Sequence, residues 1–164
     1  MQLSARQKLS LIFSGYVFSF IALLGTIFFL LLHTLLIYQT QKDVARAATD
    51  ALSNHIALEK GSIVITEEKT GNPLSSEVIE SNMSFLFLDP NLEVIRGYGL
   101  LELYNENDKE SVEVIAHMAR DTQVSLKPLT KIISWRGQNL SVYVAPLKNS
   151  GKSYGAVVSA KSLA

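Results

Sequence analysis

The first pattern along the chain is a continuous apolar segment near the N-terminus. No Asp, Glu, Lys or Arg occurs between Lys8 and Lys42, and 22 of the 30 residues in 9–38 are apolar or aromatic. A helix of about 20 mostly apolar residues spans a bilayer core, so the pattern predicts a transmembrane helix over 9–38. A cleaved signal peptide is the alternative, because Arg6 and Lys8 could form its basic start and Ala45-Arg46-Ala47 its cleavage site. The apolar region of a signal peptide is only about 7–15 residues long, so we favour an uncleaved anchor.

The apolar spacing then changes to that of an amphipathic helix. Residues 39–60 contain no Gly or Pro, and apolar side chains recur there every three or four positions. Gly61 follows as a typical helix end. We therefore predict that the membrane helix continues into a juxtamembrane helix over 39–60. The stripe on this helix is a candidate homodimer contact, and its residues are Val44, Ala48, Leu52 and His55.

Beyond Gly61 the pattern is that of short strands separated by turns. Phe85 and Phe87 alternate with Leu86 and Leu88, which predicts a strand that is buried on both faces inside a sheet. The last three strands are expected to form a meander with turns of four to five residues. Six short strands and a few helices predict an α+β domain over 61–164. The predicted strands are Ser62–Thr66, Phe85–Leu88, Leu92–Arg96, Leu129–Trp135, Leu140–Leu147 and Ser153–Ser159, and the predicted helices after residue 61 are Ser75–Ser81 and Asp108–Asp121.

Charge narrows the function and orients the membrane helix. The chain has 15 basic and 15 acidic residues, and 39–164 carry a net charge of −2, because Arg6 and Lys8 precede the apolar segment and all the acids follow it. A nucleic-acid binder needs a basic surplus, so nucleic acid is excluded as a partner. The absence of cysteine excludes a disulfide framework and a thiolate metal site. Because basic residues favour the cytoplasmic side, we expect 1–8 to be a cytoplasmic stub and 39–164 to be extracytoplasmic.

The order of these parts resembles that of a known family. The segments that carry the resemblance are Phe85–Gly99, with a strand pair around the turn Asp89-Pro90-Asn91, then Trp135–Leu147 and Gly151–Leu163. Together with the basic stub, the membrane helix and the outer helix, they resemble the extracytoplasmic PAS-like (Cache-type) sensor region of bacterial receptor histidine kinases. The resemblance implies a PAS-like antiparallel sheet with flanking helices over 61–164. It also implies the sensory input region of a two-component system, which relays an extracytoplasmic signal through the membrane helix to a kinase.

In that family the last strand leads into a second membrane helix, a relay module and the kinase. This sequence stops at Ala164, where the second helix is expected, so we expect a chain truncated before that crossing or one that pairs with another protein. No glycine-rich phosphate loop or other catalytic motif occurs, so we expect neither enzyme activity nor a cofactor in this chain. Met118 stands where a phosphoacceptor histidine at His117 would need an acid, which argues against that role.

A ligand pocket, where such a sensor has one, is expected beside the sheet. The candidate pocket residues are Arg96, Tyr98, Trp135 and Tyr143, of which the arginine could bind a carboxylate through two parallel hydrogen bonds. The alternative is that Trp135 belongs to the core and Arg96 faces solvent. The stimulus is expected to be a small molecule or a protein. The other expected partners are membrane lipid and a second copy of the chain.

A second class of function stays open at this point. The chain could be a membrane-anchored extracytoplasmic module that binds or assembles with a partner and has no kinase output. The sensor of a chemoreceptor or of a diguanylate cyclase is a variant of the first interpretation, because the input region would have the same architecture.

Overall fold

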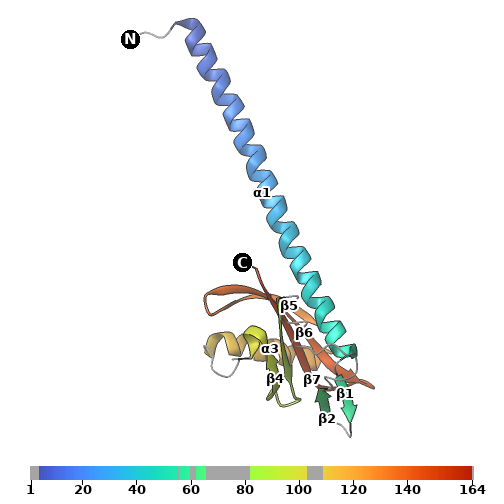
Figure 1. Cartoon of the computed structure of the whole chain (residues 1–164). Coiled ribbons are helices and arrows are strands. Elements are labelled where there is room, and N and C mark those ends of the chain that lie inside the picture. The colour runs from blue at the N-terminus through green and yellow to red at the C-terminus, as the bar shows by residue number, and fades with distance from the viewer. Residues whose placement is uncertain (1–3, 55, 60–61, 66–81, 103–108, 164) are drawn as a thin grey trace. The chain divides into compact units, whose positions relative to one another are not determined.

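The computed structural model describes residues 4–54, 56–59, 62–65, 82–102 and 109–163 of the chain (Figure 1). The chain divides into two units, Met1–Tyr38 and Gln39–Ala164. The first unit holds the beginning of helix α1, which runs from Ala5 to Asn54. The second unit holds the end of α1 and all the strands of the described residues.

The first unit is an apolar helix whose large side chains face outward. Its start has reciprocal capping, because the Ser4 amide donates to the Gln7 side chain at 2.9 Å and the Gln7 amide donates to the Ser4 hydroxyl at 3.4 Å. The hydroxyls of Thr26 and Thr34 donate to backbone carbonyls four residues earlier, which satisfies these polar groups within the helix. By length and composition, α1 is able to cross a membrane.

The end of α1 differs from the prediction. The helix stops at Asn54 rather than at Lys60, and Ile56–Glu59 forms strand β1, which the sequence pattern did not predict. Strand β1 pairs antiparallel with β2 (Ser62–Ile65), from Ile56 opposite Ile65 to Glu59 opposite Ser62. Helix propensity is a weak preference that pairing with a neighbouring strand overrides. The prediction of a helix over 39–60 was therefore wrong at its C-terminal end.

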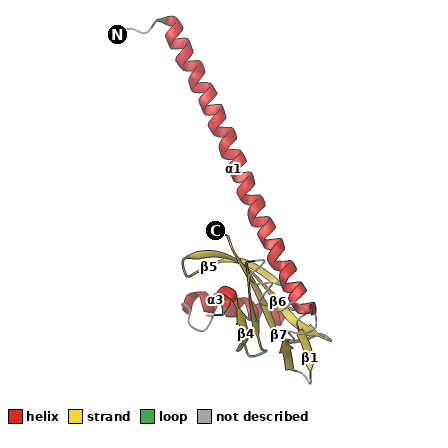
Figure 2. Ribbon diagram, in the orientation of Figure 1, coloured by secondary structure: helices red, strands yellow, loops and turns green. Residues whose placement is uncertain are grey.

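The second unit is built on a five-stranded antiparallel sheet with the strand order β4-β3-β7-β6-β5 (Figure 2). A 3-10 turn, η1 (Gly99–Leu101), follows β4, and helix α3 (Lys109–Ser125) comes before β5. This arrangement confirms the predicted α+β, PAS-like fold. The predicted helix at Ser75–Ser81 lies outside the described residues. The strands of the sheet are β3 (Met83–Leu88), β4 (Val94–Tyr98), β5 (Leu129–Trp135), β6 (Gln138–Asn149) and β7 (Lys152–Ser162).

The sheet has a hydrophobic cluster on each face, as the alternation in β3 predicted. Leu86 and Leu88 belong to the cluster beneath α3, which also includes Ile115, Met118, Ala119, Ile133, Trp135, Leu140, Val142 and Val144. Phe85 and Phe87 belong to the opposite cluster, together with Val44, Ala48, Ala51, Met83, Tyr98, Ala145 and Val157. We call these the α3-side cluster and the α1-side cluster. Strand β3 lies between β4 and β7 with all of its residues buried, which confirms its predicted central position.

Both hairpins of the C-terminal meander have tighter turns than predicted. Trp135 pairs with Gln138 and Asn149 pairs with Lys152, which leaves two residues in each turn. The turn residues all have positive φ, at 50° and 77° in Arg136-Gly137 and at 49° and 79° in Ser150-Gly151. These values are those of a type I′ turn, whose twist matches that of the flanking strands. Strands β6 and β7 therefore extend further toward the turns than their apolar alternation indicated.

Candidate functional site

The C-terminal part of α1 packs directly on one face of the sheet. Val44, Ala48 and Ala51 have no exposed surface and belong to the same cluster as Phe85 and Phe87. Two of the three helix residues are alanines, and their short side chains allow the helix backbone to approach the sheet closely. This face of α1 is therefore buried against the strands of its own chain.

Two polar contacts join this part of α1 to β7. The buried Ser159 hydroxyl donates a hydrogen bond of 2.6 Å to the backbone carbonyl of Val44. The Lys161 ammonium lies 3.1 Å from the Asp43 carboxylate and forms an ion pair that is partly exposed. We call these four residues the α1 clamp. They determine both the position and the rotation of the helix, because Ser159 reaches a specific carbonyl and Lys161 a specific side chain.

The α1 clamp corrects the predicted homodimer stripe. Val44 and Ala48 were expected to face a second chain, but the sheet of the same chain covers both of them. Leu52 is partly buried and packs against the same cluster. His55 lies outside the described residues. An apolar helical stripe indicates that the face is covered and does not indicate what covers it, which is why the sequence pattern was misleading.

The four predicted pocket residues lie on two different faces of the sheet. Trp135 is only 2% exposed and belongs to the α3-side cluster, whereas Tyr98 belongs to the α1-side cluster and Tyr143 packs against it. The guanidinium of the exposed Arg96 lies 5.3 Å from the centre of the Tyr98 ring. The Tyr98 ring in turn meets Phe87 edge to face, with 6.2 Å between the ring centres. Arg96, Tyr98 and Tyr143 thus share one face of the sheet, and Trp135 lies on the other.

Burial has a chemical effect at Tyr143. Partial removal from water raises the pKa of its phenol above the ordinary value of 10.0, because the charged phenolate is less well solvated there. The residue is therefore neutral at physiological pH, and it contributes packing rather than charge.

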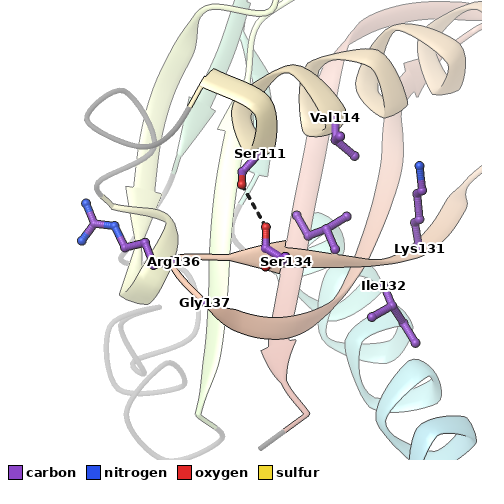
Figure 3. Close-up of a pocket in the computed structure, with 8 residues that line it drawn as sticks. Ser111, Val114, Lys131, Ile132, Ser134, Arg136 and Gly137 are labelled. Carbon is purple, nitrogen blue, oxygen red and sulfur yellow. Dashed lines mark hydrogen bonds between the residues drawn. The ribbon is translucent and has the colours of Figure 1, made fainter.

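A groove that the sequence pattern did not indicate lies between α3 and β5 (Figure 3). Its larger part is a cleft of about 380 Å³, and a smaller part of about 320 Å³ adjoins it at Val114 and Lys131. The Ser111 hydroxyl on α3 donates a hydrogen bond of 2.9 Å to the Ser134 carbonyl on β5, across the larger cleft. We call this feature the α3–β5 groove. Its residues are Ser111, Glu113, Val114, His117 and Met118 from the helix, Lys131, Ile132, Ile133 and Ser134 from the strand, and Arg136 and Gly137 from the turn.

The histidine on α3 forms a surface pair. Nδ1 of His117 lies 3.0 Å from the Asp121 carboxylate, one helical turn further along, and both side chains are exposed. This arrangement is typical of an exposed i,i+4 pair on a helix. Within the described parts of the chain, no group of three His, Asp or Glu residues is placed to hold a metal ion.

Comparison with known proteins gives distant likenesses in fold. No protein-family model and no curated protein matches the chain. Among solved structures, a sensory box sensor histidine kinase from Vibrio cholerae is similar at 10% identity and a TM-score of 0.42, over 56% of this chain and 87% of that one. The sensor domain of the zinc-responsive histidine kinase CzcS from Pseudomonas aeruginosa is similar at 13% identity and a TM-score of 0.38, over 99% of both chains. A domain of an HTR-like protein from Haloarcula marismortui shows 9% identity and a TM-score of 0.43, over 50% of this chain and 98% of that one.

These likenesses concern the fold alone. The second unit is PAS-like by its own five-stranded antiparallel sheet and helix, and no role for the chain follows from these likenesses.

Proposed function

We propose that the chain is the sensory input region of a membrane-bound two-component sensor histidine kinase. In this proposal α1 anchors the chain in the membrane, the N-terminus is cytoplasmic, and the domain that begins at Gln39 detects a signal outside the cytoplasm. Arg6 and Lys8 support this orientation, because they form a purely basic flank before the apolar segment. The signal then passes through α1 to a kinase domain that these residues do not include.

The observation that carries the proposal is the α1 clamp. Ser159 and Lys161 both lie on β7, which is the central strand of the sheet, between β3 and β6. Both side chains contact the same turn of α1. A stimulus that shifts β7 would therefore change the set of contacts that hold α1. Such a change has two discrete outcomes, clamped and released, and a signalling switch needs a structural element with two states.

A receptor chimera tests this proposal. Residues 1–163 replace the first membrane helix and sensor of a receptor histidine kinase whose output is read from a transcriptional reporter. Releasing the clamp with the double variant Ser159→Ala/Lys161→Ala is expected to change the reporter output severalfold. The matched control is Lys152→Ala, because Lys152 is an exposed lysine on the same strand. Equal output from the clamp variant, the control and the unmodified chimera, at equal protein levels, would favour the module that binds a partner without kinase output.

The orientation has a separate test that uses the absence of native cysteine. Single cysteines are introduced as Gln7→Cys and Lys152→Cys and are treated with a membrane-impermeant maleimide on intact cells. We expect the reagent to label position 152 at once and position 7 only after the membrane has been permeabilised. The reverse pattern would place the sheet domain in the cytoplasm and contradict the proposal.

A further inference from the structure

The outer edge of β5 has no partner strand among the described residues. Strand β5 is last in the strand order, and its pairing partner there is β6. Trp135 and Gln138 close a two-residue hairpin, and in such a hairpin the closing pair is hydrogen-bonded, with bonded pairs at every second position. Trp135, Ile133 and Lys131 thus bond to β6. Ser134, Ile132 and Thr130 direct their backbone N–H and C=O groups away from β6.

One of these outward groups already has a partner, and it confirms the direction. The Ser134 carbonyl accepts the hydrogen bond from Ser111. Among the backbone hydrogen bonds of the described residues, none joins the outward groups of Thr130 or Ile132 to another segment. The Ile132 side chain is also 40% exposed. Ser111 therefore closes one end of the edge, and among the described residues the outward backbone groups of Thr130 and Ile132 are left for pairing.

The α3–β5 groove runs along this edge. It combines the outward backbone groups of β5 on one side with Val114 and Met118 on the other. An edge strand beside a helix is the arrangement that binds an extended segment by strand addition, in which backbone bonds give affinity and side-chain pockets give selectivity. Residues of an added strand that lie opposite Lys131 and Ile133 would point toward α3, because side chains alternate between the faces.

The charges along the edge of β5 favour one kind of occupant. Lys131 on the strand and Arg136 on the turn line the larger cleft, where no described residue contributes a carboxylate, and Glu113 on α3 adds one acidic side chain in the smaller part of the groove. Pairing of β5 with β5 of a second copy would bring two such cationic edges together, and like charges on facing strands are destabilising. An acidic segment would instead place a carboxylate opposite Lys131 and an apolar side chain opposite Ile133.

From this geometry we propose that the α3–β5 groove is a docking site for an extended, acidic segment of another protein, which adds to β5 as a sixth strand of the sheet. The proposal goes beyond the sensory role, because it requires only the fold of the second unit and assigns that fold a protein partner.

A designed peptide pair tests the proposal on the full chain in detergent micelles. The probe is fluorescein-labelled Thr-Glu-Thr-Val-Thr-Glu-Thr, whose Glu and Val residues would face α3, and its control carries Lys in place of both Glu residues. We expect the acidic peptide to bind about tenfold more tightly than its lysine control, as measured by fluorescence anisotropy. N-methylation of the Thr amides, which face β5 in the added strand, is expected to abolish binding because it removes the backbone donors.

Three variants locate the contact. Ile132→Pro removes one outward N–H without touching the pairing with β6, and an edge strand tolerates proline at such a position. It should weaken binding about tenfold, whereas Ile132→Thr, which keeps the N–H, should not. Lys131→Glu should reverse the preference between the acidic and basic peptides, and Lys148→Glu, at an exposed position near the other end of β6, should leave it unchanged. The fluorescence of Trp135 verifies that each variant is folded.

Several outcomes would overturn the proposal. Equal binding of the N-methylated peptide, or competition by inorganic phosphate alone, would mean that the groove binds anions without strand addition. Loss of a dimer in Ile132→Pro, measured by sedimentation and accompanied by no peptide binding, would make a second copy the occupant. No binding of the acidic peptide at millimolar concentration would reject the site. None of these results depends on the receptor chimera, so the two proposals fail separately.

Discussion

The two buried serines on the α1-facing side of the sheet should respond in opposite ways to the same substitution. Ser141 and Ser159 both have no exposed surface, and both lie on the face that contacts α1. The hydroxyl of Ser159 donates to the Val44 carbonyl, whereas that of Ser141 has no hydrogen-bond partner within the described residues. Substituting alanine at each position therefore removes a satisfied hydroxyl in one case and an unsatisfied one in the other.

The expected free energies follow from this difference. A buried hydrogen bond contributes about 1 kcal/mol net, and the Val44 carbonyl keeps its helical partner, so Ser159→Ala should lower the free energy of unfolding by about 1 kcal/mol. An unsatisfied buried hydroxyl costs about 1–3 kcal/mol, and its removal leaves a small void that offsets part of the gain. Ser141→Ala should therefore leave the free energy unchanged or raise it by up to about 1 kcal/mol.

The single tryptophan makes the measurement specific to the sheet domain. Trp135 is buried in the α3-side cluster, and the apolar segment contains no tryptophan. Urea unfolding of the full chain in micelles, followed by Trp135 fluorescence, thus reports on the second unit. A difference of about 1 kcal/mol also corresponds to about 3–5 °C in melting temperature for a domain of this size. Equal destabilisation by both substitutions would refute the reasoning, because it would mean that the Ser159 bond contributes nothing beyond the volume of the hydroxyl.

The remaining predictions concern backbone packing, pH and charge. Gly97→Ala should destabilise the domain by about 2 kcal/mol in the same urea assay, because a Cβ there would come within 2.6 Å of the Leu101 carbonyl oxygen. Burial raises the pKa of Tyr143 in the folded state, so the stability that its neutral phenol contributes is present below about pH 10 and is lost as the pH rises through the folded-state pKa. Tyr143→Phe should therefore lose less stability than the unmodified chain as the pH rises above about 10. Lys161→Ala should lower stability by about 0.5 kcal/mol at low ionic strength and by less at high salt, because its ion pair with Asp43 is partly exposed. An identical loss at both salt concentrations would assign the effect to packing of the lysine stem.

The pattern of apolar residues alone was sufficient to predict the elements that lie in one kind of environment along their whole length. An uncharged segment over 9–38 has only one long-lived conformation in an apolar environment, because every backbone group must bond within the helix. The alternation of Phe85 and Phe87 with Leu86 and Leu88 required two buried faces, and this identified β3 as a central strand. The strand Leu129–Trp135 was also correctly bounded, since a turn residue with positive φ follows it directly.

Tertiary structure decided what each apolar face covers. The sequence showed that Val44 and Ala48 lie on one face of a helix, but only the folded chain shows that its own sheet occupies that face. Likewise, Trp135 and Tyr143 both flank the sheet, and the pairing register places them on opposite sides of it. The α3–β5 groove has no local sequence signal, because it arises where a long-range strand order leaves β5 at an edge. Patterns of period two or 3.6 record burial, whereas the partner that provides the burial is a property of contacts between residues that are distant in sequence.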